Sequence, residues 1–149
     1  MDFLIVDDDP AVLPITAGMV RRLGFGFRLA EDGEAALASC SAHPPHAVLM
    51  DVQMPRMDGL AATRELRRLQ REHQLPPFPI IVASAFDGPA DRAACFDAGA
   101  DGFVTKPLLL AKLGAEIFRV LRLTTLLPHG AGASRPPADG EDGRRSLRA

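Results

Sequence analysis

Short, continuously apolar runs alternate with helix-length amphipathic stretches along residues 1–127. These runs predict strands of a sheet covered on both faces, because such strands are buried throughout and lack an alternation of apolar and polar residues. Five strands are expected, over residues 3–6, 25–30, 46–50, 80–85 and 102–105. Five helices are expected over residues 10–23, 33–42, 58–72, 89–98 and 108–126. This order predicts the α/β class and a (βα)5 architecture, a doubly wound five-stranded parallel sheet with right-handed crossovers.

Two prolines affect where the first helix begins. Asp9 suits the N-cap and Pro10 suits the first helical position, so the helix is expected from residue 10. Pro14 has no N–H that could bond the carbonyl of Pro10, so the helix alternatively starts later or kinks early.

The composition changes after residue 127. Residues 128–149 are rich in Pro, Gly, Arg and Asp, and Leu147 is their only large apolar residue. Such a segment cannot bury enough apolar surface to offset its ordering entropy, so it is expected to be a disordered tail. The predicted organisation is one globular domain over residues 1–127 followed by this tail.

Charge and cysteine content exclude several functional classes. The formal net charge is −2, from 17 Lys and Arg against 19 Asp and Glu, which gives no electrostatic case for binding nucleic acid or an anionic membrane. The two cysteines, Cys40 and Cys95, do not make a disulfide framework. No signal peptide or membrane-spanning run is apparent, so a cytoplasmic location is expected.

Polar side chains follow four of the predicted strands at their carboxyl ends. Asp7-Asp8-Asp9 follow the first strand, Asp51 the third, and Thr105-Lys106-Pro107 the fifth, while Ser84 lies at the end of the fourth. In open parallel sheets, ligands bind beyond the carboxyl ends of the strands, at the point where the strand order reverses. If the first and third strands are neighbours, the carboxylates of Asp7, Asp8 and Asp51 share one small space.

These residue types together favour phosphoryl transfer. Like charges so close raise a pKa unless a cation is present, and carboxylate oxygens without a nearby His or Cys suit Mg²⁺. A lysine and a hydroxyl at the same edge can hold an anion. Such sites act by positioning and by neutralising charge on the phosphoryl oxygens, and an aspartate is a suitable nucleophile.

Four segments together resemble the receiver domain of two-component response regulators, the CheY-like family. They are FLIVDDDP, VLMDVQMPRMDG, IIVASA and GADGFVTKP, in this order, and the resemblance covers nearly all of residues 1–125. It implies a flavodoxin-like fold with strand order 2-1-3-4-5. It further implies a phosphorylation-activated signalling switch, which is not an enzyme in the usual sense although it assists its own phosphorylation and dephosphorylation.

The resemblance assigns the acceptor and the Mg²⁺ ligands. It implies that Asp51 accepts the phosphoryl group and, with Asp8, ligates Mg²⁺. Asp7 would act mainly through water, and the backbone carbonyl of Gln53 would be a further ligand.

The resemblance also assigns the switch. Lys106 would pair with the phosphoryl group, and Pro107 matches the cis-proline that follows this lysine in the family. Ser84 would bond a phosphoryl oxygen, and Phe103 matches the aromatic residue that turns inward when Ser84 moves. Phe86, two residues after Ser84, is apolar where many receivers have a polar residue, so a long-lived aspartyl-phosphate is expected.

The resemblance also implies classes of partner proteins. The donor would be a histidine kinase or a phosphotransfer protein of a phosphorelay. A downstream protein would bind the face formed by the helix over 89–98, the strand over 102–105 and the helix over 108–126. Surplus apolar residues on that last helix suggest a homodimer as well. Residues 128–149 are too few for a DNA-binding output domain, so a stand-alone receiver is expected.

Two alternatives remain open on the sequence. A haloacid-dehalogenase-like phosphatase would use Asp7 as nucleophile in a D-x-D pattern with Asp9, although the chain is short for that family. A docking module that is never phosphorylated is the other, and the complete set of site residues argues against it. The modified aspartate separates the first alternative from a receiver: Asp7 for the phosphatase, Asp51 for the receiver.

Overall fold

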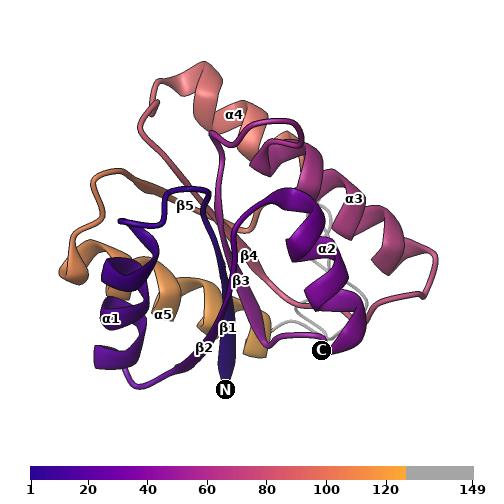
Figure 1. The fold of residues 1–149 in the computed structure, drawn as a ribbon, viewed down its shortest axis with the longest axis horizontal. Coiled ribbons are helices and arrows are strands. Elements are labelled where there is room, and N and C mark those ends of the chain that lie inside the picture. Colours follow the sequence, from indigo (N-terminus) through magenta and orange to yellow (C-terminus); the bar gives the residue numbers. More distant parts are fainter. Residues whose placement is uncertain (127–149) are drawn as a thin grey trace.

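A computed structural model describes residues 1–126 and contains the predicted alternation of strands and helices (Figure 1). The strands are β1 (Asp2–Val6), β2 (Gly26–Ala30), β3 (Ala47–Asp51), β4 (Ile80–Ser84) and β5 (Gly102–Thr105). The helices are α1 (Leu13–Arg22), α2 (Gly33–Ala42), α3 (Gly59–Arg71), α4 (Pro89–Asp97) and α5 (Leu110–Leu126). The (βα)5 prediction is therefore confirmed.

The five strands form one parallel sheet in the order β2-β1-β3-β4-β5, which confirms the expected flavodoxin-like topology. β1 and β3 are hydrogen-bonded neighbours, with Val6 opposite Met50. β3 and β4 are neighbours as well, with Asp51 opposite Ala83. The carboxyl ends of β1, β3 and β4 therefore meet at one edge of the sheet.

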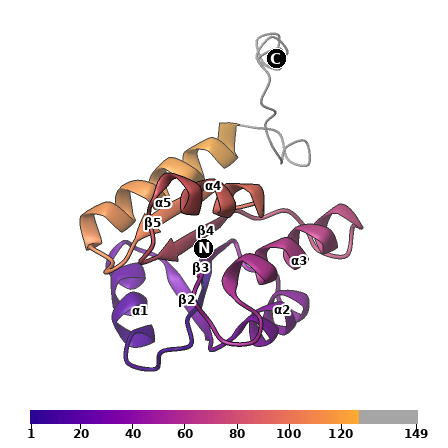
Figure 2. The same ribbon diagram turned by 90° about the horizontal axis from the view of Figure 1, so that it is seen from above.

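The helices cover both faces of the sheet (Figures 1 and 2). α1 and α5 lie on one face, where the core includes Phe3, Ile5, Val20, Leu113 and Ile117. α2, α3 and α4 lie on the other face, where the core includes Leu4, Met50, Leu66, Ile80 and Phe103. Two separate apolar clusters explain why the strands are apolar on both sides.

The expected start of α1 at residue 10 is wrong, and the alternative of a later start is right. The helix begins at Leu13 with Val12 at the N-cap, and Pro14 lies in its first turn. A proline is tolerated there because the first helical N–H groups have no partner within the helix. Asp9 caps a preceding turn: its side chain accepts the N–H of Ala11 at 2.9 Å, and its carbonyl accepts that of Val12 at 3.0 Å.

Several smaller features complete the description of the fold. Asp32 and Asp58 cap α2 and α3, because their side chains accept the N–H groups of Ala35 and Ala61 at 2.7 and 2.8 Å. Cys40 and Cys95 are free and buried. Among the described residues, no helix is long and apolar enough to cross a membrane. The predicted tail over residues 128–149 lies outside the described part of the chain.

Candidate functional site

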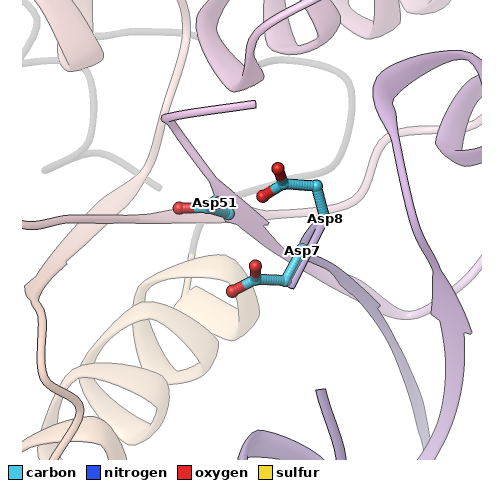
Figure 3. A group of neighbouring side chains, drawn as sticks. All are labelled: Asp7, Asp8 and Asp51. Carbon is cyan, nitrogen blue, oxygen red and sulfur yellow. The ribbon is translucent and has the colours of Figure 1, made fainter. Parts of the chain in front are cut away.

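Three carboxylates gather at the carboxyl ends of β1 and β3. Asp7 and Asp8 follow β1 directly and Asp51 is the last residue of β3, so the pairing of these strands brings the three together. Each offers one carboxylate oxygen, and these oxygens all lie within 4.8 Å of one another. Figure 3 shows their carboxyl groups pointing in a common direction. Asp7 and Asp51 are buried, at 5% and 3% exposure, whereas Asp8 is exposed.

Lys106 provides the positive charge of the site. It follows β5, and its Nζ donates to Asp51 Oδ1 at 2.9 Å and to Asp7 Oδ2 at 3.1 Å. Its backbone N–H donates to the carbonyl of Ser84 at 2.9 Å, which ties the lysine to the end of β4. The Lys106–Pro107 peptide bond is cis, as the resemblance implied.

Burial and the bonds of Lys106 act in opposite directions on the pKa values of Asp51 and Lys106. Burial raises the pKa of Asp51 to about 6, because the bond from Lys106 only partly offsets it and the charges of Asp7 and Asp8 raise the pKa further. Burial would lower the pKa of Lys106, but its bonds and charge interactions with Asp51 and Asp7 outweigh burial and raise that pKa.

The donor set fits a hard divalent cation. Three carboxylates face one ammonium group, so the site carries an excess of negative charge. The candidate ligands are all oxygen atoms, as Mg²⁺ prefers, and the exposure of Asp8 leaves the cluster accessible to the waters that Mg²⁺ retains. Asp7, Asp8 and Asp51 are the side chains that could hold the ion.

Ser84 is buried beside this cluster at the end of β4, with 2% exposure. Its Oγ accepts a bond from Gln53 Nε2 at 3.1 Å and from the Phe86 N–H at 3.0 Å. A hydroxyl that accepts two bonds keeps its own hydrogen available for an anion. The bond from the Gln53 side chain to Ser84 was not predicted, because nothing in the sequence indicates that this side chain reaches Ser84.

The predicted switch residue Phe103 is buried in β5, at 4% exposure. The guanidinium carbon of Arg92 in α4 lies 4.4 Å from the centroid of its ring. Its backbone N–H donates to Glu116 Oε2 of α5 at 2.9 Å. Neither Arg92 nor Glu116 was singled out as a contact of Phe103 from the sequence, because these contacts depend on how α4 and α5 pack against β5.

The segment between Asp51 and α3 holds the acceptor strand against the helix. The N–H of Gly59 donates to the carbonyl of Val52 at 2.9 Å. A Cβ added at Gly59 would overlap the backbone carbonyl of Asp51. Glycine therefore allows the start of α3 to approach the end of β3 closely.

Comparisons with known proteins all return one kind of domain. The sequence matches the family model described as "Response regulator receiver domain" over residues 3–118. A similar protein is "Response regulator MprA" of Mycolicibacterium vanbaalenii, 40% identical over 131 residues, which are 88% of this chain and 54% of that protein. The protein of the same name from Mycobacterium leprae is 40% identical over 124 residues, 83% of this chain and 52% of that protein. The chain thus spans about half the length of the curated relatives it matches.

Solved structures show the same fold. Chemotaxis protein CheY4 of Vibrio cholerae superposes with a TM-score of 0.72 at 25% identity, covering 80% of this chain and 97% of that one. The receiver domain of a sensor histidine kinase from Pseudomonas aeruginosa, with a magnesium ion coordinated in its active-site cleft, gives a TM-score of 0.68 at 32% identity. That match covers 81% of this chain and 94% of the other.

Proposed function

Because the chain belongs to the response regulator receiver domain family, we propose that it is a phosphorylation-activated switch of a two-component system or phosphorelay. Receiver domains are signalling switches and are generally not classed as enzymes. The phosphoryl group would pass from a histidine kinase or phosphotransfer protein to Asp51. The observation that carries this proposal is the position of Asp51, buried among Asp7 and Asp8 and bonded to Lys106.

The acidic cluster would hold Mg²⁺ during this transfer. Asp8, Asp51 and the backbone carbonyl of Gln53 would be ligands, and Asp7 would act mainly through water. The ion would supply neutralisation of charge on the phosphoryl oxygens. The magnesium ion in the active-site cleft of the similar Pseudomonas aeruginosa receiver supports this assignment.

Side chains of this protein would carry out the remaining steps of the transfer. A carboxylate oxygen of Asp51 would bond the phosphorus atom while the phosphorus–nitrogen bond of the donor phosphohistidine breaks. Lys106, which bonds Asp51 Oδ1 in the structure, would pair with the transferred group. The Ser84 hydroxyl, whose acceptor positions are already used by Gln53 and Phe86, would donate its hydrogen to a phosphoryl oxygen.

Phe103 would couple phosphorylation of Asp51 to a change on the surface that binds partners. As Ser84 follows the phosphoryl group, the ring of Phe103 would fill the space behind it, and the face formed by α4, β5 and α5 would change its preference for partners. A downstream protein or a second copy of the chain would bind there. Leu109, just before α5, and Leu123 of α5 are exposed apolar side chains, and they support an interaction surface.

Three expectations from the sequence stay predictions. A cytoplasmic location and the absence of nucleic-acid and membrane partners rest on composition and charge. Stand-alone action is the third, and the curated relatives are about twice as long as the region they share with this chain.

The experiment is labelling with acetyl phosphate and Mg²⁺, followed by intact mass and peptide mapping. Wild type should gain one phosphoryl group on Asp51, and Asp51→Asn should gain none. Asp7→Asn, which keeps the acceptor but removes one neighbour of Lys106, should still be labelled on Asp51 at a reduced rate. Labelling of Asp7, retained in Asp51→Asn, would instead support the haloacid-dehalogenase-like alternative. No labelling of folded wild type, with no beryllofluoride binding, would support a docking module.

A further inference from the structure

Phe103 is held from two directions by residues of the helices on either side of β5. Arg92 of α4 lies over the ring, with its guanidinium carbon 4.4 Å from the centroid. The ring itself is buried, whereas Arg92 is an exposed residue. The guanidinium therefore covers one face of the ring, in an arrangement that the ring quadrupole favours.

The backbone N–H of Phe103 is held by the carboxylate of Glu116, and Arg119 holds that carboxylate in turn. The Phe103 N–H donates to Glu116 Oε2 at 2.9 Å. Arg119 donates to both oxygens of that carboxylate, from Nε to Oε1 at 2.9 Å and from Nη2 to Oε2 at 2.7 Å. Arg119 Nη2 also donates to the carbonyl of Asp101 at 3.2 Å, just before β5.

Glu116 interacts electrostatically with both Arg92 and Arg119. Burial would raise the pKa of Glu116, but the bonds from Arg119 and Phe103 and the charges of Arg119 and Arg92 outweigh burial and hold that pKa below its ordinary value. Arg92 therefore interacts favourably with Glu116 as well as with the Phe103 ring. The side chain of Phe103 is held from α4, and its backbone from α5.

We propose that Arg92 is a positioning residue for Phe103: its guanidinium stabilises the buried ring whether or not Asp51 carries a phosphoryl group. The inference rests on the proposed function, in which phosphorylation favours the buried position that the ring already has in this structure. Since coupling between two equilibria is reciprocal, a contact that favours the buried ring also strengthens binding of a phosphoryl group or its analogue at Asp51. Arg92 thereby sets how readily the switch turns on, although it does not touch the acceptor.

The expected size of the effect follows from the exposure of Arg92. A cation–π contact at an exposed position changes the ratio of two ring positions by about two- to fivefold. Apolar packing in the core beside α4 accounts for the rest of the burial, so loss of Arg92 should weaken the preference for the buried ring without abolishing it.

The chain offers a direct reporter of the ring position, because it contains no Trp and no Tyr. In Phe103→Trp, residue 103 is the sole tryptophan, and acrylamide quenching without Mg²⁺ measures its accessibility. Adding Arg92→Met, which keeps a long apolar side chain without charge, should raise the exposed-to-buried ratio about two- to fivefold. Arg92→Lys should restore it towards the parent. Arg71→Met, which removes an exposed charge of α3, should leave it unchanged. Equal quenching in the parent and Arg92→Met would overturn the inference.

A second measurement keeps the native ring. In chains with Phe103 unchanged, the ring-proton chemical shifts of Phe103 should move in Arg92→Met and return in Arg92→Lys. Unmoved shifts in a folded Arg92→Met variant would contradict a role for the guanidinium.

Titration with Mg²⁺ and beryllofluoride separates this inference from the proposed function. Half-saturation should require about two- to fivefold more beryllofluoride in Arg92→Met than in wild type, by the same coupling. If wild type binds no beryllofluoride but quenching still changes in Arg92→Met, the proposed function is contradicted, while the role of Arg92 in positioning the ring is supported. If wild type binds beryllofluoride and neither readout responds to Arg92, the inference fails alone.

Discussion

Lys106 Nζ lies 2.9 Å from Asp51 Oδ1, although 55 residues separate the two along the chain. β4 lies between β3, which ends at Asp51, and β5, which Lys106 directly follows, so the lysine reaches across the end of β4 to the acceptor. Its backbone N–H bonds the carbonyl of Ser84 and directs this reach. The counter-charge of the acceptor is therefore supplied by a loop that also belongs to the proposed switch.

Asp51→Asn should stabilise the metal-free fold at pH 7. Burial and the charges of Asp7 and Asp8 raise the pKa of Asp51 to about 6, so its ionised form is less favourable in the folded than in the unfolded chain. Removing that charge should raise the free energy of unfolding by about 1–3 kcal/mol. Urea denaturation in the presence of EDTA measures this.

The matched control is Glu31→Gln, which removes one negative charge from an exposed position and should change stability by less than about 0.5 kcal/mol. An Asp51→Asn variant less stable than wild type would show that the bond to Lys106 outweighs the crowding of carboxylates.

Glu116 should make the fold sensitive to acid. Burial opposes its ionisation, but the bonds from Arg119 and Phe103 prevail and lower its pKa. The stabilisation by this carboxylate is therefore fully present above its unfolded pKa and is lost as the pH falls through its lower folded pKa. Glu116→Gln should cost about 1–2 kcal/mol at pH 7 and less in acid, as measured by urea denaturation at both pH values. An equal cost at both would contradict this.

Ser84→Ala should impair both packing and phosphoryl uptake. It leaves the donors Gln53 Nε2 and Phe86 N–H without their acceptor, at a cost of about 1 kcal/mol of stability. It also removes a hydrogen bond to the transferred group, so uptake from acetyl phosphate should slow about tenfold or more. Ser84→Thr should retain uptake, and Ser41→Ala in α2 should behave as wild type. Unchanged uptake in Ser84→Ala would remove Ser84 from the mechanism.

Phe86 should prolong the life of the aspartyl-phosphate. Its backbone N–H donates to the Ser84 hydroxyl at 3.0 Å, so a bulky apolar residue borders the end of β4, where we expect hydrolytic water to approach. Loss of the label after donor removal should take minutes or longer in wild type and should be several-fold faster in Phe86→Ala. Phe96→Ala, at another exposed phenylalanine, serves as control. Half-lives of seconds in both wild type and Phe86→Ala would count against this shielding.

Arg67 should stabilise the edge of the sheet opposite the acceptor. Its guanidinium donates to the carbonyls of Gly99 and Phe78 at 2.8 and 2.9 Å and to Asp101 Oδ2 at 2.6 Å. A lysine cannot make all three bonds, so Arg67→Lys should cost about 1–3 kcal/mol by thermal or urea unfolding. Arg71→Lys, in the same helix, should cost little; equal losses in both variants would refute a specific role for Arg67.

The strands were predictable from the sequence because burial on both faces leaves a direct signature. The runs at 3–6, 80–85 and 102–105 match β1, β4 and β5 within one residue at each end. The start of α1 was less certain, because Asp9 satisfies the criteria for a helix cap yet caps a turn, and Pro14 suits only a first helical turn.

Part of the candidate site could also be predicted from the sequence, and part could not. The gathering of Asp7, Asp8 and Asp51 was predictable because adjacent parallel strands end at one edge of the sheet. The contacts of Gln53 with Ser84 and of Arg92 with Phe103 were not, because they join side chains from separate elements without a recognisable spacing.

The close approach of Gly59 to Asp51 limits how this chain can evolve. Every side chain at position 59 would push its Cβ into the carbonyl of the acceptor residue, and the end of β3 would have to move. A saturation library at that codon, selected for signalling, should return almost only glycine. Exposed positions of α3 such as Arg64 should accept many residues, so substitutions should accumulate there in descendants of this gene while position 59 stays glycine.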